Sequence, residues 1–206
     1  NSKITETKKV EKVVRQDASS GIIVFAAAAK KSLIDSIVEL CKKADLDLVG
    51  IDIKPGAIIR AVVAGNDSRA RLIIDMGVGG TGASIAEGKS LRVTSTVPFG
   101  TKSLGSDLSK PVPDLRNVLS PVFDELVHLT KFFENRVCPG LKIEEIIISG
   151  TGSGIPGIKE CFQQETNLPT TLANPFERVD THKFPVPAGF GHTFADSIGL
   201  AMRKDD

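Results

Sequence analysis

The hydrophobic positions of this chain fall into short apolar runs, which predict strands, and into stretches of helical spacing, which predict helices. Strands are expected over 21–28, 46–53, 72–76, 83–86, 91–97, 144–149 and 170–172, with another beginning at residue 10. Helices are expected over 33–44, 57–64, 114–133, 155–166 and 192–203. This order of elements predicts an α/β fold in which helices flank mixed sheets.

Turn and capping residues separate these elements. Pro55 suits the first turn of the second helix, and Asp114 suits the N-cap of the third. The clearest internal break is the Gly-Asn-Asp-Ser segment at 65–68. The three strands that follow this break have short connections, so we expect an antiparallel meander.

The first candidate site is a glycine-rich turn at the end of the strand over 72–76. Asp75 ends the strand and could orient a metal-bound water near a phosphate. Gly77, Gly79 and Gly80 would offer backbone N–H groups, and Thr81 would offer a hydroxyl. The same residues also fit a plain tight hairpin turn with a capping aspartate, and the segment alone leaves both interpretations open.

A second glycine-rich turn follows the strand over 144–149. Ser149 leads into Gly150, Thr151, Gly152 and Ser153, and the helix predicted from residue 155 would place its free N–H groups nearby. An ordinary strand-to-helix turn, with glycines for close packing, explains the segment equally well. It is neither a Walker A motif nor a GxGxxG dinucleotide fingerprint, because the required spacing is missing.

Composition narrows the function classes. The 206 residues suit one large domain or two small lobes, and a net charge of +1 gives no general attraction to nucleic acid. The three cysteines are scattered, fit a reducing cytoplasm, and include two expected buried thiols, Cys41 and Cys161. The three histidines are interpreted as surface or loop residues. No apolar run approaches the ~20 residues of a membrane helix, and no signal peptide is visible. The chain opens on Asn1 and not on Met, so we expect a fragment.

The series of motifs resembles a known family. It consists of a strand, Asp-x-Gly turn, hairpin, strand and long helix, then a strand, Ser-Gly-x-Gly-Ser-x-Ile-Pro-Gly, a helix and Asn-Pro-Phe. This order is similar to that of the PilM proteins of type IV pilus assembly, over roughly residues 10–203. The resemblance implies an actin-like (ribonuclease H-like) fold of the actin, Hsp70 and sugar-kinase superfamily. It also implies N-terminal incompleteness, because the family's first phosphate turn should precede residue 10.

The resemblance also implies the roles of the two turns and the division of the chain. Residues 1–66 would form the small accessory subdomain plus a linking helix, and residues 67–206 a second lobe with a shortened inserted subdomain between 100 and 113. The phosphate turn would be Asp75 to Thr81, and the adenosine-side turn would be Gly150 to Ser153. If ATP binds, Asp75 would hold Mg²⁺ or the attacking water.

The function implied by the resemblance is a cytoplasmic scaffold of pilus assembly. It would bind the short cytoplasmic tail of an inner-membrane, PilN-like partner and lie at the membrane only through that partner, with ATP binding optional and weak or absent ATPase activity. Self-association is compatible with this function, and nucleic acid is not an expected partner. Two alternatives remain at this point: a nucleotide-free scaffold of a type II secretion system and a small-molecule kinase of the same superfamily.

Overall fold

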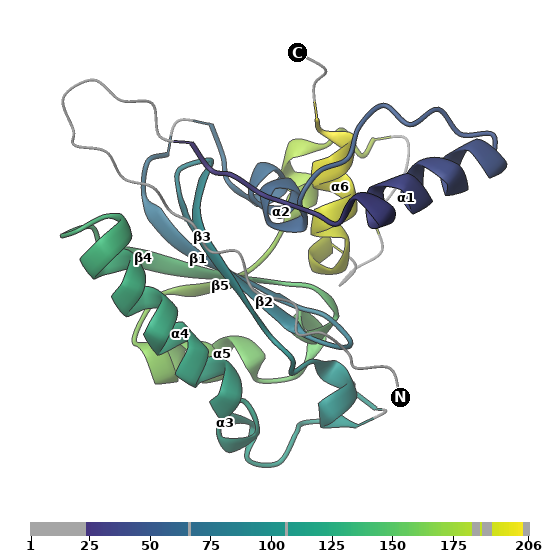
Figure 1. The fold of residues 1–206 in the computed structure, drawn as a ribbon. Coiled ribbons are helices and arrows are strands. Elements are labelled where there is room, and N and C mark those ends of the chain that lie inside the picture. The colour runs from purple at the N-terminus through teal and green to yellow at the C-terminus, as the bar shows by residue number, and fades with distance from the viewer. Residues whose placement is uncertain (1–23, 66, 106, 183–185, 187–190, 204–206) are drawn as a thin grey trace, which may run out of the picture. The chain divides into compact units, whose positions relative to one another are not determined.

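The structure is a computed structural model that describes residues 24–65, 67–105, 107–182, 186 and 191–203. The chain separates into two compact units, Asn1–Ile53 and Lys54–Asp206, and each is described by itself (Figure 1). The strand predicted to begin at residue 10 lies outside the described residues. The lobe boundary predicted at residue 66 stays a prediction.

In the first unit, the described residues contain one helix, α1 (Lys31–Lys43), which confirms the helix predicted over 33–44. The strands predicted over 21–28 and 46–53 were wrong for residues 24–28 and 46–53, which form no regular element. A strand needs a neighbour to pair its backbone N–H and C=O groups. Neither segment has such a neighbour among the described residues, and Val24 and Val49 are 69% and 77% exposed.

The second unit is built on one mixed five-stranded sheet of order β3-β2-β1-β4-β5 (Figure 1). Its strands are β1 (Ala70–Met76), β2 (Thr81–Glu87), β3 (Ser90–Val97), β4 (Ile143–Ser149) and β5 (Thr170–Leu172). Strands β1, β2 and β3 form the predicted antiparallel meander, whereas β4 runs parallel to β1 and β5 runs parallel to β4.

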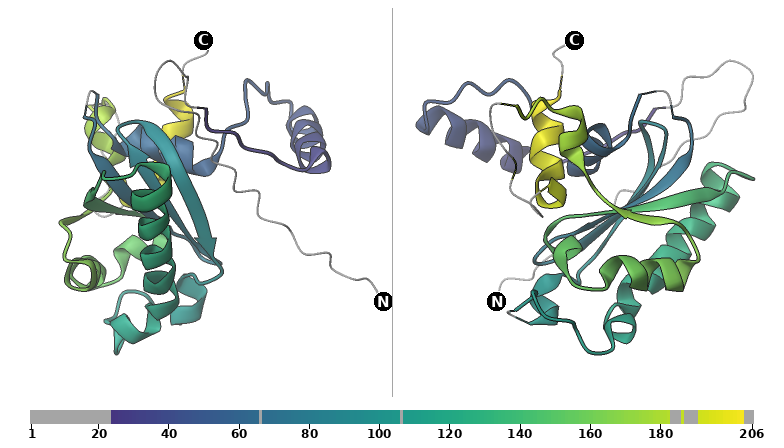
Figure 2. Two further views of the ribbon diagram at one scale, coloured as in Figure 1. Left: turned by 60° about the vertical axis from the view of Figure 1, so that its left-hand side comes forward. Right: turned by 180° about the vertical axis from the view of Figure 1, so that it is seen from behind.

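Helices cover both faces of this sheet, which explains the central apolar runs 72–74 of β1 and 146–148 of β4. One face packs against α4 (Ser120–Phe132) and α5 (Ile158–Thr166), whose course is visible in Figure 2. The other face packs against α2 (Lys54–Val62) and α6 (Ala195–Ala201). Alternation along β1 sends Leu72 and Ile74 to the first face and Ile73 to the second.

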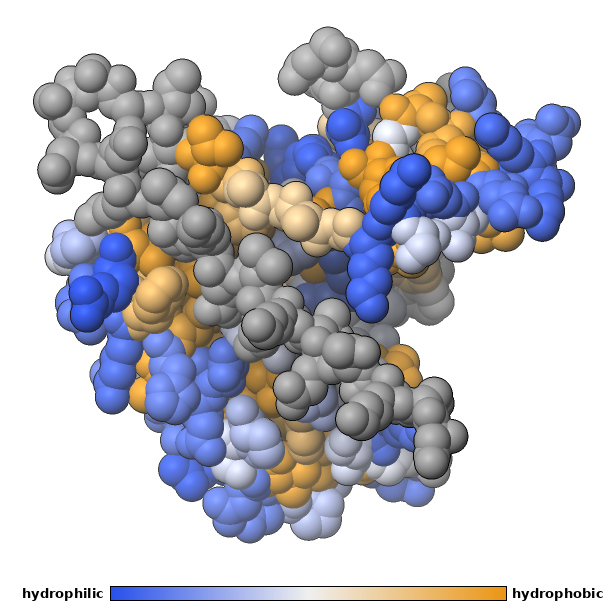
Figure 3. Space-filling view, in the orientation of Figure 1, coloured by the Kyte–Doolittle hydropathy of each residue, from blue (hydrophilic) through white to orange (hydrophobic). Residues whose placement is uncertain are grey.

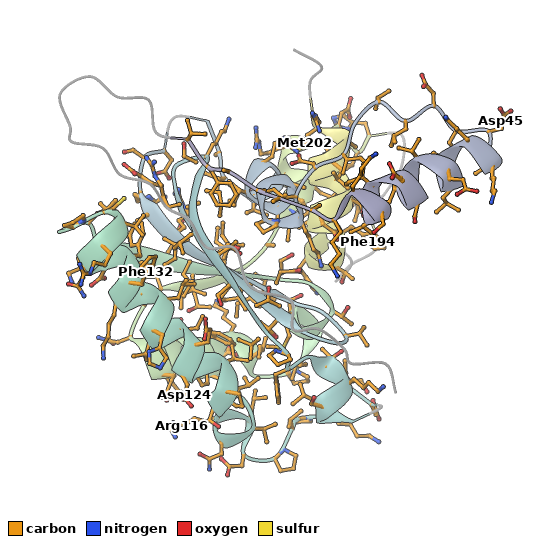
Figure 4. All side chains as sticks on the ribbon, viewed as in Figure 1. Asp45, Arg116, Asp124, Phe132, Phe194 and Met202 are labelled. Atoms are coloured by element: carbon orange, nitrogen blue, oxygen red, sulfur yellow. The ribbon has the colours of Figure 1, made fainter. Side chains whose placement is uncertain are left out.

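The long helix predicted over 114–133 is interrupted. It consists of α3 (Leu115–Val118), α4 and a π-helical turn at Phe133–Val137, and Asp124 and Phe132 mark the course of α4 in Figure 4. Pro121 lies in the first turn of α4. Its ring restricts the backbone conformation of the preceding residue, and its nitrogen has no hydrogen to donate to a carbonyl oxygen of α3. The predicted cap was wrong, because Asp114 has φ 51° and makes no side-chain cap bond.

The other helix predictions hold with shifted ends. Helix α2 confirms the helix predicted over 57–64, whereas α5 begins at Ile158 and α6 at Ala195, three residues later than expected in each case. Short 3-10 turns, Thr151–Gly154 and Gly191–Phe194, lie ahead of these two helices. Both cysteines expected to be buried, Cys41 and Cys161, are only half-buried.

Arg71 is a charged side chain inside this apolar framework, at 4% exposure. Its guanidinium bonds to Asp67 and Glu145, while its Nη1 has no protein partner among the described residues. Arg69 also hydrogen-bonds Asp67, and together the two guanidiniums hold the pKa of that carboxyl well below its usual range. The carboxylates of Asp67 and Glu145 balance the charge of Arg71, so β1 can hold a buried arginine.

Helices α2 and α6 cross at close range. Gly199 of α6 lies against α2 so tightly that a β-carbon there would overlap the carbonyl oxygen of Ala57. Arg60 Nη1 donates to the Gly199 carbonyl oxygen at 2.7 Å. Arg178 Nη1 donates to the carbonyl oxygens of Arg60 at 2.6 Å and Val63 at 3.0 Å, which satisfies the C-terminal end of α2. Among the described residues, no helix has the length and apolarity needed to cross a membrane.

We predict that Gly199→Ala destabilises the second unit. In an open helix this change adds about 1 kcal/mol of stability, because alanine is the better helix former. Here the new methyl group must push α6 away from α2, at a cost of about 1–3 kcal/mol. Urea unfolding measures the difference. Gly65→Ala is the control, because an added β-carbon meets nothing within 4 Å. A stabilised Gly199→Ala variant would contradict the helix contact.

Candidate functional site

The pairing of β1 with β4 brings the two glycine-rich turns together. The strands are parallel neighbours, and Asp75 is in register with Ser149, the last residue of β4. Both turns therefore leave the same edge of the sheet side by side. Ligands of α/β proteins bind at the carboxyl ends of parallel strands, where strand-to-helix loops expose backbone groups.

The glycines of the second turn permit direct contact with the end of β1. Gly150 has φ 83°, and a β-carbon there would lie 2.6 Å from Oδ1 of Asp75 and 2.7 Å from the carbonyl oxygen of Met76. A β-carbon on Gly152 would overlap the Met76 side chain. Gly150 and Gly152 are therefore needed for packing, while Thr151 between them is exposed.

The first turn is held by the segment that follows β3. The Gly77 N–H donates to the Gly80 carbonyl oxygen at 2.9 Å, and the carbonyl oxygens of Gly77 and Val78 accept from the N–H groups of Thr101 and Lys102 at 3.0 Å. Within the described residues, the backbone N–H groups of Val78 and Gly79 have no protein acceptor. These two adjacent donors are the part of the turn available to an anion.

Gly100 is a residue that sequence reasoning missed. A β-carbon there would lie 2.6 Å from both the Gly77 carbonyl oxygen and the Gly80 nitrogen, so only glycine lets the chain pass so close to the turn. Thr81, a predicted ligand, is buried, and its hydroxyl donates to the Phe99 carbonyl oxygen at 2.7 Å. The Thr81 hydroxyl thus holds the turn in place.

The second turn is fixed from the side of α6. The carbonyl oxygen of His192 accepts from the Gly150 N–H and from the Ser149 hydroxyl, both at 3.0 Å. The Ser153 hydroxyl donates back to the Gly150 carbonyl oxygen and is buried. The turn continues as a 3-10 turn and reaches α5 only at Ile158, so the helix end predicted to adjoin it is displaced.

Lys54 and Asp196 also join this site, although sequence reasoning singled out neither. Nζ of Lys54, the first residue of α2, lies 2.6 Å from Oδ2 of Asp75 and 3.7 Å from Oδ2 of Asp196, near the start of α6. Burial alone would lower the pKa of Lys54, but the hydrogen bond and charge of Asp75, with those of Asp196, outweigh it and raise the pKa. The ammonium is therefore charged throughout the neutral pH range.

Two hollows border the contact between the turns. One of about 210 Å³ is lined by Lys54, Asp75 and Gly80 together with side chains of β2 and β3. The other, of about 430 Å³, is lined by Ser153, Gly154 and His192 together with the first turn of α5. Asp75 lines one hollow and touches Gly150, which leads into the residues that line the other. The larger hollow alone lies within the usual size of a small-molecule site, about 300–1,000 Å³.

The predicted magnesium site at Asp75 does not match the side chains around it. Mg²⁺ takes oxygen ligands in octahedral geometry, commonly one or two carboxylates with waters and phosphates. The carboxylates of Asp75 and Asp196 both contact the Lys54 ammonium instead. Across the described ranges, no group of three or more histidine, cysteine, aspartate or glutamate side chains could hold a metal ion.

Comparison with known proteins bears on the fold. No protein-family model and no curated protein matches the sequence. Among solved structures, the chain is similar to a PilM-PilN type IV pilus biogenesis complex, with TM-score 0.62, 20% identity, and coverage of 85% of this chain and 58% of that one. The fold is actin-like.

Two further actin-like structures support this conclusion. The ethanolamine utilization protein EutJ from Carboxydothermus hydrogenoformans has TM-score 0.56 at 16% identity, with 84% of this chain and 61% of that chain covered. MreB5 of Spiroplasma citri bound to ADP also has TM-score 0.56 at 16% identity, with 85% and 65% covered. The chain thus spans roughly three-fifths of the length of these actin-like structures, and the predicted α/β, actin-like fold with helices flanking a mixed sheet is confirmed.

We predict that two of the predicted ligand glycines respond differently to substitution. Gly150→Ala places a methyl group in the left-handed region and against Asp75, and should destabilise the fold by at least about 1–2 kcal/mol. Gly79→Ala meets nothing within 4 Å and should change stability by less than about 0.5 kcal/mol. Thermal or urea unfolding of both variants tests this. Equal stability of the two would contradict the close contact between the turns.

Proposed function

We propose that this chain is part of an actin-like scaffold of type IV pilus assembly. In this proposal it lies in the cytoplasm, binds a nucleoside phosphate such as ATP or ADP where the two glycine turns meet, and binds the cytoplasmic tail of an inner-membrane, PilN-like protein. The observation that carries the nucleotide part is the contact of Gly150 with Asp75 at the shared end of β1 and β4. The likeness to the PilM-PilN complex supports the pilus role.

The nucleotide would occupy both hollows. Its phosphates would lie near the free N–H groups of Val78 and Gly79 and near the Lys54 ammonium, because anions bind backbone donors and lysine strongly. Its sugar and base would lie along the exposed Thr151 and the larger hollow, beside Ser153. MreB5 of Spiroplasma citri, which shares the fold, has been solved bound to ADP.

We propose that the nucleotide acts mainly as a structural ligand. A carboxylate that activates water must be free to accept its proton. Oδ2 of Asp75 already accepts from the Lys54 ammonium at 2.6 Å, and Oδ1 lies against Gly150. Asp75, the predicted catalytic residue, is therefore poorly placed as a base, which favours the scaffold over the small-molecule kinase.

The partner tail would dock on the first unit. Helix α1 buries none of its residues, and Leu33 and Leu40 are 55% and 65% exposed. Leu46 and Val49, in the chain after α1, are also exposed. Figure 3 shows that apolar and polar side chains are mixed on the visible surface of the molecule. Ile34, Ile37 and Val38 are half-buried, so the apolar face of α1 is exposed in part. A partly exposed apolar helix face is a common site for a short partner segment. Four lysines at its two ends would suit an acidic tail.

We predict that the α1 leucines are needed for partner binding. Leu33→Ser with Leu40→Ser should weaken binding of a labelled peptide, made from the cytoplasmic tail of the cognate PilN-like protein, by about tenfold or more, because each leucine contributes about 1.5–3 kcal/mol when buried. Fluorescence anisotropy measures the affinity. Val127→Ser, at a position of α4 that is 49% exposed, is the matched control and should leave the affinity unchanged. Failure of the wild-type chain to bind the peptide would overturn the pilus role.

A further inference from the structure

We infer that Lys54 takes the place of a divalent cation beside Asp75, so that the site accepts the phosphates of a nucleotide in their metal-free form. The nucleotide part of this inference rests on the function proposed above. The exclusion of the metal rests only on the side chains of the site.

The ammonium of Lys54 occupies the position that a metal ion beside Asp75 would need. Nζ of Lys54 makes its shortest contact, 2.6 Å, with Oδ2 of Asp75, and also lies 3.7 Å from Oδ2 of Asp196. A divalent ion that used either oxygen would have to displace this ammonium or share the carboxylate with it. Like charges at such distances repel strongly in a partly buried site. The lysine therefore competes directly with a metal.

The ammonium of Lys54 is accessible to a ligand in the smaller hollow. The Lys54 side chain is 52% exposed and lines the smaller hollow, whereas that of Asp75 is only 14% exposed. An ammonium has three N–H donors. Among the described residues its partners are Asp75 and Asp196, so one donor remains for a phosphate oxygen.

Lys54 and Asp75 are the two charged residues that line the hollow. Its other lining residues carry no charge: Pro55, Ile58, Ile73, Gly80, Gly82, Ser84, Thr94 and Thr96. Lys54 also begins α2, a nine-residue helix whose N-terminal end carries partial positive charge. A phosphate entering the hollow would meet the lysine and the start of α2. The ammonium and the helix end are the positive groups at the hollow, and Asp75 and Asp196 are the negative groups that the ammonium balances in part.

Direct binding of Mn²⁺, a spectroscopic stand-in for Mg²⁺, tests the exclusion without any nucleotide. Titration followed by electron paramagnetic resonance should show no Mn²⁺ binding to the wild-type protein at sub-millimolar concentration. Lys54→Gln leaves the two carboxylates without their cation and should gain Mn²⁺ affinity by about tenfold or more. Lys54→Arg keeps the positive charge and should show no gain. The double variant Lys54→Gln, Asp75→Asn should lose the Mn²⁺ affinity that Lys54→Gln gained.

Two outcomes would overturn the inference. One is Mn²⁺ binding by the wild-type protein that Asp75→Asn removes. The other is a Lys54→Gln variant that keeps the wild-type melting curve and gains no Mn²⁺ affinity. Melting curves of every variant identify a loss of fold, and Lys54→Met then repeats the test with a side chain of similar length.

Calorimetry with ADP then tests the metal-free ligand. The wild-type protein should bind ADP with the same affinity in excess EDTA as in Mg²⁺, and Lys54→Gln should weaken binding in EDTA by about tenfold, because a charged partner of the phosphate is lost. Binding that requires Mg²⁺ would overturn the inference. Absence of ADP binding under both conditions would overturn the proposed nucleotide site, while the Mn²⁺ titration still decides the role of Lys54.

Discussion

The parallel pairing of β1 with β4 is the constraint on which the rest of the structure depends. It places Asp75 beside Ser149, so that two turns far apart in the sequence begin at the same edge of the sheet. Close contact then requires that Gly150 and Gly152 carry no β-carbon, and the His192 carbonyl oxygen secures the second turn by two hydrogen bonds. The packing demand and the proposed ligand site are thus two consequences of one strand register.

The same edge of the sheet is connected to the helices on one face. Lys54 links the start of α2 to Asp75 on β1 and to Asp196 on α6, and Gly199 lets those two helices lie close together. A ligand that draws the ammonium toward its phosphates would therefore act on the sheet edge and on both helices at once. If the chain is the nucleotide-binding scaffold proposed above, this connection joins the ligand site to both helices.

Local sequence patterns predicted most helices and strands of the second unit. They missed contacts between residues that lie far apart in the sequence. The apolar runs at 72–76 and 146–149 are strands because helices cover both faces of the sheet. The similar run at 46–53 is no strand, since apolar character cannot supply a pairing neighbour. The glycines and Asp75 were visible as motifs, but the partners of Asp75, Lys54 and Asp196, come together only in the folded chain.

The most direct test of the account is a two-dimensional ¹H–¹⁵N NMR titration of the chain with ADP in excess EDTA. The account predicts that the largest shift changes fall on both turns together, at the backbone N–H groups of Val78, Gly79 and Thr151, and saturate with one dissociation constant. Changes confined to one turn, changes that fall elsewhere, or no change at millimolar ADP would contradict the claim that the two glycine turns form a single nucleotide site.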